Sequence, residues 1–207
     1  MARPREFDEQ TVLEVAVRCF WHRGYDSTSV RDLVESTGIT AASLYNAFGD
    51  KRALYRRALD HYIESSIADR IERCETLAPR AAIAAFFEEI VARSLGDHEH
   101  KGCMLVNAAL EVAPHDPGFR KLVADVLVHI EDFFLDRVRA GQADGTITRA
   151  QPAEMLARHL LGVLMGVRVL ARVRPERALL EGVVAPALAL LAGTEWQGEA
   201  PAATRPQ

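Results

Sequence analysis

A short segment of the sequence, residues 38–55, gathers small polar side chains around a tyrosine and a lysine: GITAASLYNAFGDKRALY. Hydroxyl and amide groups can hydrogen-bond to base edges, and phenol and ammonium groups can bind phosphate. Ala41 and Ala42 add no bulk, so a helix that carries them is slim enough to enter a groove about 12 Å wide. The residues that could supply this chemistry are Thr40, Ser43, Tyr45, Asn46 and Lys51.

These side chains can act together only if short helices position them, and helix signals surround the segment. Ser29 stands three residues before Asp32, which is capping-box spacing, and Gly38 suits the tight bend where this helix ends. Thr40 and Asp50 are suitable N-cap residues for the two helices that follow. The pattern therefore predicts helices over residues 7–24, 29–37, 40–48 and 50 to about 74.

Residues 28–48 have the layout of a helix-turn-helix. The first of its helices would pack on the core through an apolar side, and the second would turn its polar residues outward. The residues expected to point inward are Val30, Leu33, Val34, Ile39, Leu44 and Phe48.

Apolar periodicity and proline positions predict five further helices, over residues 79–95, 103–113, 116–141, 152–173 and 174–193. No strand pattern competes with them, so the fold class is all-α with about nine helices. We expect an N-terminal helix-turn-helix domain over 1–50, continuing into a linking helix to about 74, and a larger C-terminal effector and dimerisation domain over 51–194. Residues 195–207 are expected to form a disordered tail.

The composition is that of a soluble globular protein of 207 residues, with 49% hydrophobic and 26% charged residues. A net charge of −4 gives no overall attraction to nucleic acid, so binding to it would depend on a local patch. The three cysteines are widely spaced, which favours reduced thiols in a cytoplasm. Two arginines interrupt the most apolar run, residues 160–173, and no signal peptide begins the chain, so we expect a cytoplasmic protein without a membrane partner.

Motifs of enzymes do not occur in the chain: it has no P-loop, no G-x-S-x-G, no G-x-G-x-x-G and no H-E-x-x-H. We therefore expect neither catalysis nor a cofactor.

The stretch GYDSTSVRDLVESTGITAASLYNAFGDKRALY resembles the DNA-binding domain of TetR-type bacterial transcriptional regulators, and the match is dense over residues 7–60. The Gly-Tyr pair, the glycine of the turn, and the Leu-Tyr, Phe and Lys residues fall where that pattern has them. A second segment, KGCMLVNAALEVAPHDP, resembles a subset of the family. The resemblance implies an all-helical homodimer that binds a double-stranded DNA operator and a small-molecule effector.

By position in that pattern, one set of residues reads bases and another binds phosphate. The base-reading set is Arg31, Ala41, Ala42, Ser43 and Asn46, and the phosphate-binding set is Ser29, Thr40, Tyr45 and Lys51. Arg3 and Arg5 could reach an adjacent minor groove from an N-terminal arm. Simpler alternatives stay open, because Tyr45 could be packed, Lys51 solvated, and Arg31 paired with Asp32 or Glu35.

A polar stripe on the helix predicted over 103–113 is the candidate effector site. Cys103, Asn107 and Glu111 are spaced i, i+4, i+8, and Leu110 lies alongside. Apolar walls would come from Phe86, Ile90 and Phe133, and Arg168 could pair with Glu111 or emerge at the dimer surface. In the alternative, Asn107 and Glu111 face water and Cys103 is a packed thiol.

The loop DHEHKGC, residues 97–103, contains side-chain types that bind metals, and Cys103 could sense oxidants. No second ligand cluster of matching geometry accompanies it, so we expect no metal.

The last two helices carry wide apolar faces and are the expected homodimer interface, with Gly162 and Gly166 permitting close approach. These faces comprise Leu156, Leu160, Val163, Leu164 and Val167 on the first, and Leu179, Leu180, Val183, Val184, Ala187, Leu188 and Leu191 on the second. Together the patterns predict a ligand-responsive transcriptional regulator, most simply a repressor. The alternative is a helical metal- or small-molecule-binding protein, or a thiol or metal sensor, whose helix-turn-helix contacts proteins.

Overall fold

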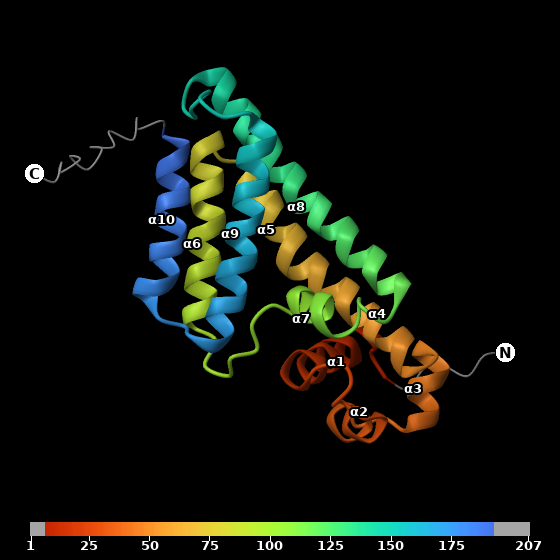
Figure 1. Ribbon diagram of the computed structural model, residues 1–207. Coiled ribbons are helices and arrows are strands. Elements are labelled where there is room, and N and C mark those ends of the chain that lie inside the picture. Colours follow the sequence, from red (N-terminus) through yellow and green to blue (C-terminus); the bar gives the residue numbers. More distant parts are fainter. Residues whose placement is uncertain (1–6, 193–207) are drawn as a thin grey trace, which may run out of the picture.

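The computed structural model describes residues 7–192, and this part of the chain is helical throughout, with no strand (Figure 1). Because α4, the π-helical segment η1 and α5 follow one another without a break, they form one long helix, and the predicted nine helices are confirmed. None of the helices in residues 7–192 is both long and apolar enough to cross a membrane. The elements are α1 (Glu9–Arg23), α2 (Val30–Thr37), α3 (Ala41–Phe48), α4 (Lys51–Tyr62), η1 (Ile63–Ala68), α5 (Asp69–Glu75), α6 (Pro79–Leu95), α7 (Met104–Glu111), α8 (Pro117–Asp144), α9 (Ala153–Val173) and α10 (Arg177–Leu191).

The first three helices form a compact head, and their ends follow the local signals in the sequence. Ser29 and Asp32 form the predicted capping box at the start of α2, and Gly38 ends this helix with φ of 72°. The Thr40 hydroxyl accepts the N–H of Ser43 at the start of α3. Between them lies the turn of the predicted helix-turn-helix.

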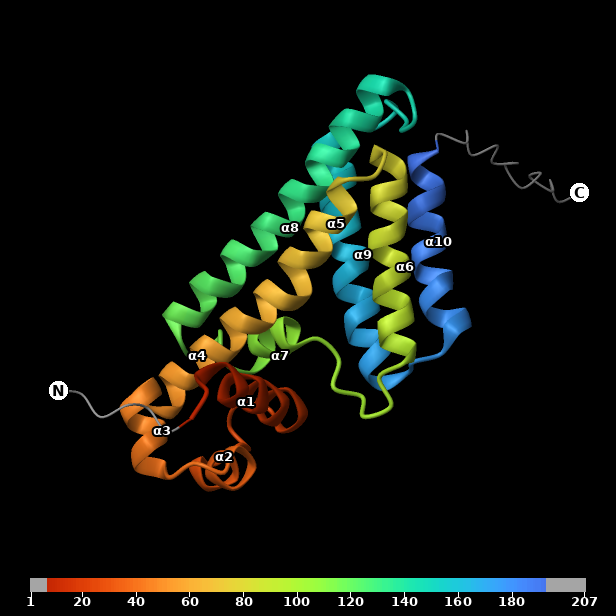
Figure 2. The ribbon, with the colours of Figure 1, turned by 180° about the vertical axis from the view of Figure 1, so that it is seen from behind.

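A long helix, which we call the rod (α4, η1 and α5, residues 51–75), leaves the head and runs along the rest of the molecule (Figure 2). Asp50 caps its start by accepting the N–H of Ala53 at 2.7 Å. The middle of the rod is the π-helical segment η1, a form that is rare and is frequent at functional sites. The rod packs on both parts of the molecule, so the domain boundary at residue 50 stays a prediction.

The body consists of α6, α8, α9 and α10 packed beside the end of the rod (Figure 1). Four buried phenylalanines lie at its centre, and neighbouring rings are 5.2–6.0 Å apart. Pro79 opens α6 and Asp116 caps α8, as predicted, and Pro186 lies inside α10. The four rings belong to Phe86, Phe87, Phe133 and Phe134.

Head and body meet at α7 and at the near end of α8. The Tyr55 ring of the rod contacts Phe20 of α1 at 4.9 Å and Phe119 of α8 at 5.2 Å. Arg52 also donates two hydrogen bonds to Asp116, at 2.6 and 2.9 Å. An aromatic cluster and a bidentate ion pair therefore hold the rod against both parts.

Two expectations fall on residues outside the described range. The tail over residues 195–207 and the arm that carries Arg3 and Arg5 both lie beyond residues 7–192.

The capping box of α2 predicts a pH-dependent stability. Hydrogen bonds from the Ser29 hydroxyl and N–H lower the pKa of Asp32 to about 2, against 3.8 for the free side chain. A carboxyl whose pKa is depressed in the folded state contributes stability above its unfolded pKa and loses it as the pH falls through the folded value. We expect Asp32→Asn to lower the melting temperature at pH 7, and the difference from wild type to shrink below about pH 4.

Asp125→Asn is the matched control, because Asp125 forms an exposed ion pair with Lys121 on α8. Its melting temperature should stay close to that of wild type. A difference between Asp32→Asn and wild type that is equally large at pH 7 and below pH 4 would contradict the linkage.

Candidate DNA-binding surface and effector pocket

The outer surface of α3 is formed by the residues predicted to face DNA. Thr40, Ala41, Ala42, Tyr45 and Asn46 are exposed, and Ser43 is half-buried. The opposite side is fixed to the core, since Leu44 and Phe48 are buried. The helix therefore presents a slim polar face while two apolar anchors hold its orientation.

Tyr45 is 44% exposed, and its ring is not packed in the core. This exposure is unusual for a large aromatic side chain, and it leaves the hydroxyl free to reach a phosphate next to the groove. The alternative that Tyr45 serves as a core aromatic does not fit this position.

The N-terminus of α3 has its own hydrogen bonds. The Thr40 hydroxyl accepts the N–H of Ser43 at 3.1 Å and donates to the Ser43 hydroxyl at 3.0 Å. These two side chains set the start of the helix, and both lie at the positive end of its dipole. An anion approaching this end meets donors that are already oriented.

Lys51 is the first residue of α4, and its ammonium group lies 4.4 Å from the centre of the Tyr25 ring. The contact holds the ammonium group against the head. Lys51 is half-buried, which differs from the fully solvated charge of the simpler alternative.

Arg31 donates to Glu35 at 2.8 Å across one turn of α2, and its side chain is 87% exposed. This surface pair is one of the alternatives that the sequence left open. Because exposed i, i+4 pairs are weak, a base edge or phosphate can compete with Glu35 for the guanidinium.

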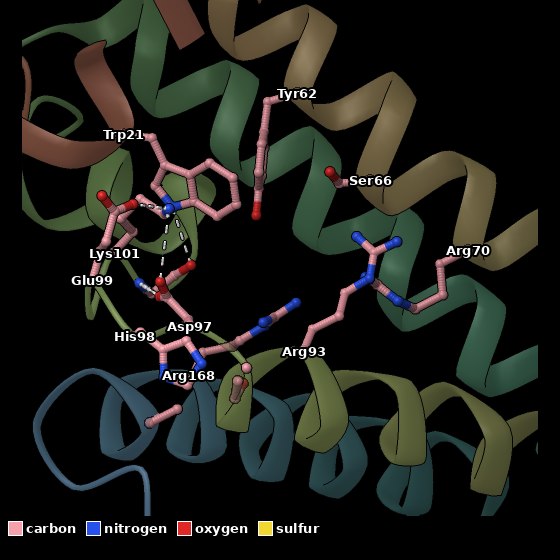
Figure 3. A pocket seen from close by; sticks show the side chains of 14 residues that line it. Trp21, Tyr62, Ser66, Arg70, Arg93, Asp97, His98, Glu99, Lys101 and Arg168 are labelled. Carbon is pink, nitrogen blue, oxygen red and sulfur yellow. Dashed lines mark hydrogen bonds and ion pairs between the residues drawn. The ribbon is translucent and has the colours of Figure 1, made fainter. Parts of the chain in front are cut away.

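A cavity of about 520 Å³ lies where the head, the rod and the body meet (Figure 3). Trp21 reaches it from α1, Tyr62 from α4 and Ser66 from η1. Arginines enter from the other side, together with the loop that joins α6 to α7. The volume falls within the range of small-molecule sites, about 300–1,000 Å³. The rod also contributes Arg70, and the residues from the other side are Arg93, Ser94, Gly96, Asp97, His98, Glu99, Lys101, Gly102, Arg168 and Ala171.

The predicted effector residues divide between several environments. Arg168 lines the cavity of about 520 Å³, and its role in ligand binding stays a prediction. Phe86, Ile90 and Cys103 instead line a narrow cavity of about 20 Å³ that also touches Arg168. Phe133 is buried against Phe86, with ring centres 5.4 Å apart.

Asn107 is buried but serves as a structural link. Its amide donates to the carbonyl of Lys101 at 3.0 Å, and its oxygen accepts from Arg172 at 2.7 Å. The Asn107 side chain thereby joins the α6–α7 loop to α9.

Leu110 and Glu111 correct the prediction that the polar stripe lines a pocket. Leu110 is 66% exposed, and neither residue lines a described cavity. A Glu111 oxygen accepts the N–H of Tyr25 at 3.3 Å, so it contacts the head instead of a ligand or Arg168. The reason is the position of α7, whose far end meets the head and not the interior of the body.

Several residues that line the large cavity were not predicted from the sequence, among them Trp21, Tyr62 and Arg70. Trp21 and Tyr62 fit the apolar stripes of their helices, and their rings lie 5.0 Å apart. One signal was available in Arg70, a charged residue that falls on the buried side of the rod and is only 2% exposed. Such a position indicates a specific electrostatic role.

Within residues 7–192, no three or more His, Cys, Asp or Glu side chains are grouped so that they could hold a metal ion. Asp97 accepts the N–H of Gly102 at 2.9 Å and so organises its own loop. The Cys103 thiol is 5% exposed and accepts a hydrogen bond from the Tyr62 hydroxyl at 3.5 Å. This thiol is packed away from solvent.

Comparisons with known proteins match both halves of the chain. The family model of bacterial regulatory proteins of the tetR family matches residues 12–58, and that of the tetracyclin repressor-like C-terminal domain matches residues 79–185. The chain belongs to the TetR family of transcriptional regulators.

Individual relatives cover most of the chain. The HTH-type transcriptional regulator YezE of Bacillus subtilis is 31% identical over 92% of this chain and all of its own, and the repressor ComR of Escherichia coli is 29% identical over 93% and 89%. A structure of the TetR-family regulator CifR with cysteine substitutions, in complex with 26-bp operator DNA, has a TM-score of 0.81. It is 35% identical and covers 92% of this chain and 100% of that one.

The ion pair on α2 predicts a gain in DNA affinity when its acidic partner is neutralised. Glu35→Gln frees Arg31 and removes one negative charge from the surface that would face phosphates. We expect binding to DNA from upstream of the protein's own gene to tighten roughly three- to tenfold at low salt. Fluorescence anisotropy measures the change.

Glu72→Gln is the control, because Glu72 is exposed on α5 and the substitution makes the same charge change away from the head. Equal effects of the two variants would show that net charge, and not the release of Arg31, is responsible.

Proposed function

We propose that this TetR-family regulator is a homodimeric repressor that binds a palindromic operator through α3 and the start of the rod and leaves it when a small molecule occupies the large cavity. The observation that carries the proposal is the composition of that cavity, which brings Trp21 of the DNA-binding head and the rod into one site with the body. A ligand there would contact both parts at once.

The DNA contacts would be divided between two kinds of residue. Ser29, Thr40, Tyr45 and Lys51 are placed to bind phosphate and fix the head on the duplex. The other face of α3 offers small groups to the bases, with methyl groups for thymine and hydroxyl or amide groups for polar edges. Arg31 adds a guanidinium beside them. The residues of that face are Ala41, Ala42, Ser43 and Asn46.

The CifR structure supports this assignment because that regulator is bound to double-stranded operator DNA, and its fold covers nearly the whole of this chain. The repressor ComR supports the sign of regulation.

The outer surfaces of α9 and α10 support the dimer. Exposed apolar side chains gather there, with Met155 58%, Val169 48%, Val173 72% and Leu190 43% exposed. An exposed apolar face on adjacent helices indicates an interaction surface. The exposed apolar residues of α9 and α10 are not all the same as those predicted to form the dimer interface, because several of the predicted residues are buried in the core of the subunit. The buried members are Leu156, Leu160, Leu164, Val167, Leu180, Val184, Ala187 and Leu191.

Glycines on these surfaces leave room for close helix contact. A Cβ atom added at Gly162, Gly166 or Gly182 would meet nothing within 4 Å in the subunit. Two heads related by a two-fold axis must match half-sites about 34–36 Å apart or a multiple of it. A ligand that shifts the rods therefore weakens DNA binding by changing this spacing.

The DNA contacts predict the effect of a double substitution, Tyr45→Ala with Lys51→Ala. Each change removes a group placed to bind phosphate, so we expect binding to DNA from upstream of the protein's own gene to weaken at least tenfold. The slope of log affinity against log salt should fall by about one for each lost phosphate contact of Lys51. Anisotropy titrations between low and moderate salt measure both quantities.

Arg56→Ala serves as the control, since Arg56 lies on the rod in an exposed pair with Asp60. Unchanged affinity and salt slope in the double variant would sink the DNA-binding mechanism.

The open space at Gly162 predicts a variant that separates folding from dimerisation. In the lone subunit the side chain of Gly162→Gln enters solvent and gains helix propensity, so the fold should be retained. In the dimer the added bulk would separate the helices, and we expect the dissociation constant of the dimer to rise at least tenfold. Sedimentation velocity over a concentration series measures this constant.

Ala143→Gln on exposed α8 is the matched control and should leave dimerisation unchanged. A Gly162→Gln protein that dissociates no more readily than wild type would place the interface elsewhere.

A further inference from the structure

Arg168 carries a buried charge without a counterion in the described chain. It lies on the inner side of α9 and is 9% exposed. No hydrogen bond or ion pair within residues 7–192 involves its guanidinium, which points into the large cavity (Figure 3). An ionised group in such a place is costly unless something pairs with it.

The neighbours of Arg168 increase the positive charge. Arg70 of the rod is 2% exposed and lies 3.1 Å from Glu89 of α6. The same carboxylate also pairs with Arg73 at 2.8 Å and Arg93 at 2.9 Å. Three guanidinium groups therefore share Glu89, and Arg168 adds a fourth with no acid of its own.

The positive charges of Arg70 and Arg168 are close enough to affect each other. Burial lowers the pKa of Arg70, and the positive charge of Arg168 lowers it further. Figure 3 shows the side chains of Arg70, Arg93 and Arg168 converging on one side of the cavity. The cavity therefore has a cationic end that faces an open volume of about 520 Å³.

The other end of the cavity has a different character. Lys101 is paired with Glu99 and lies 3.9 Å from Asp97, so the acidic side chains of the loop are already engaged with a cation. Trp21 forms a flat wall here, and its indole N–H donates to the carbonyl of Gly102 at 3.1 Å. This end offers an aromatic surface, and the ammonium group of Lys101 lies 5.3 Å from the centre of the Trp21 ring.

We propose that the large cavity binds an organic anion, whose carboxylate or phosphate group pairs with Arg168 and Arg70 and whose remaining part lies against Trp21. This inference rests on the proposed function in taking the cavity as the effector site, and it adds the chemical class of the effector. Ser66 of η1 lines the cationic end and places a hydroxyl donor beside the same headgroup.

Thermal unfolding of the protein without DNA tests the site, with benzoate, benzamide and inorganic phosphate as probes at equal ionic strength. Benzoate and benzamide share a ring but differ in charge, and phosphate supplies a headgroup without a ring. With a dissociation constant of about 1 mM, about 50 mM of an anion should raise the wild-type melting temperature by about 5–9 °C. Benzamide should have no comparable effect.

Arg168→Met keeps the length and the apolar stem of the side chain but removes its charge. Because the arginine is unpaired, we expect this variant to melt at or above the wild-type temperature without anion and to lose the anion-dependent rise. Arg80→Met is the matched control, because Arg80 is exposed at the start of α6. It should respond to the anions as wild type does.

The outcomes distinguish the headgroup from the ring and the site from the regulatory function. A rise in melting temperature with benzoate alone indicates that the site binds an aryl carboxylate. A rise with phosphate alone, or with both anions, indicates that the anionic headgroup is sufficient for binding. Either result supports the anion site only if Arg168→Met abolishes the rise. An equal rise in Arg168→Met, or no rise with either anion, overturns the proposal. Operator binding without ligand tests the DNA-binding part of the proposed function, so either can fail while the other holds.

Discussion

The unbroken backbone hydrogen bonding of the rod is the constraint on which the rest of the structure depends. The rod joins Lys51, at the end that lies in the head, to Arg70, at the cationic end of the cavity, within one helical element. At about 1.5 Å per residue, its 25 residues span roughly 37 Å. A shift of Arg70 therefore cannot be absorbed by a flexible linker, and it must bend the rod or move the head. The π-helical segment η1, which follows Tyr62 and contains Ser66, is where we expect such a bend.

Contacts beside the rod decide which of these movements is favoured. Tyr55 lies between Phe20 and Phe119, and Arg52 holds Asp116, so the first turns of the rod are fixed to the head and to α8. Trp21 of α1 adds a contact that depends on the loop through the carbonyl of Gly102. The head is thus held by an aromatic cluster that tolerates small rotations and by polar bonds that specify one orientation. A ligand beside Trp21 would act on the polar bonds.

Capping residues and apolar periodicity in the sequence predicted the helices. The candidate sites depend on contacts between residues far apart in the sequence, which these short-range patterns do not reveal. Ser29, Thr40 and Asp50 set helix ends by bonding to backbone groups within three residues, so the sequence alone identified these ends. The prediction that the polar stripe of α7 lines a pocket was wrong for Leu110 and Glu111. Helical spacing determines which residues share a face, but it does not determine which part of the molecule that face contacts. Along eight residues, the stripe passes from Cys103 in the body to Glu111 against the head. The sequence indicates that Arg168 is unusual, because a charge within an apolar helix is costly unless it is paired. Its neighbours Arg70 and Arg93 come from two other helices, so the sequence of α9 alone could not predict them.

Because α9 has one face toward the cavity and another toward the outside of the subunit, the buried charge of Arg168 could affect more than ligand binding. Arg168 points into the cavity, and Val169 and Gly162 lie on the exposed side of the same helix, where the partner subunit would pack. Without an anion, repulsion between Arg168 and Arg70 favours a separation of α9 from the rod, and an anion between them removes that repulsion. The same event would then change the distance from the rod to the helix that sets the dimer axis. In the proposed dimer the spacing of the two heads would be set by that axis, so charge neutralisation at Arg168 would be coupled to DNA binding without any contact between ligand and DNA.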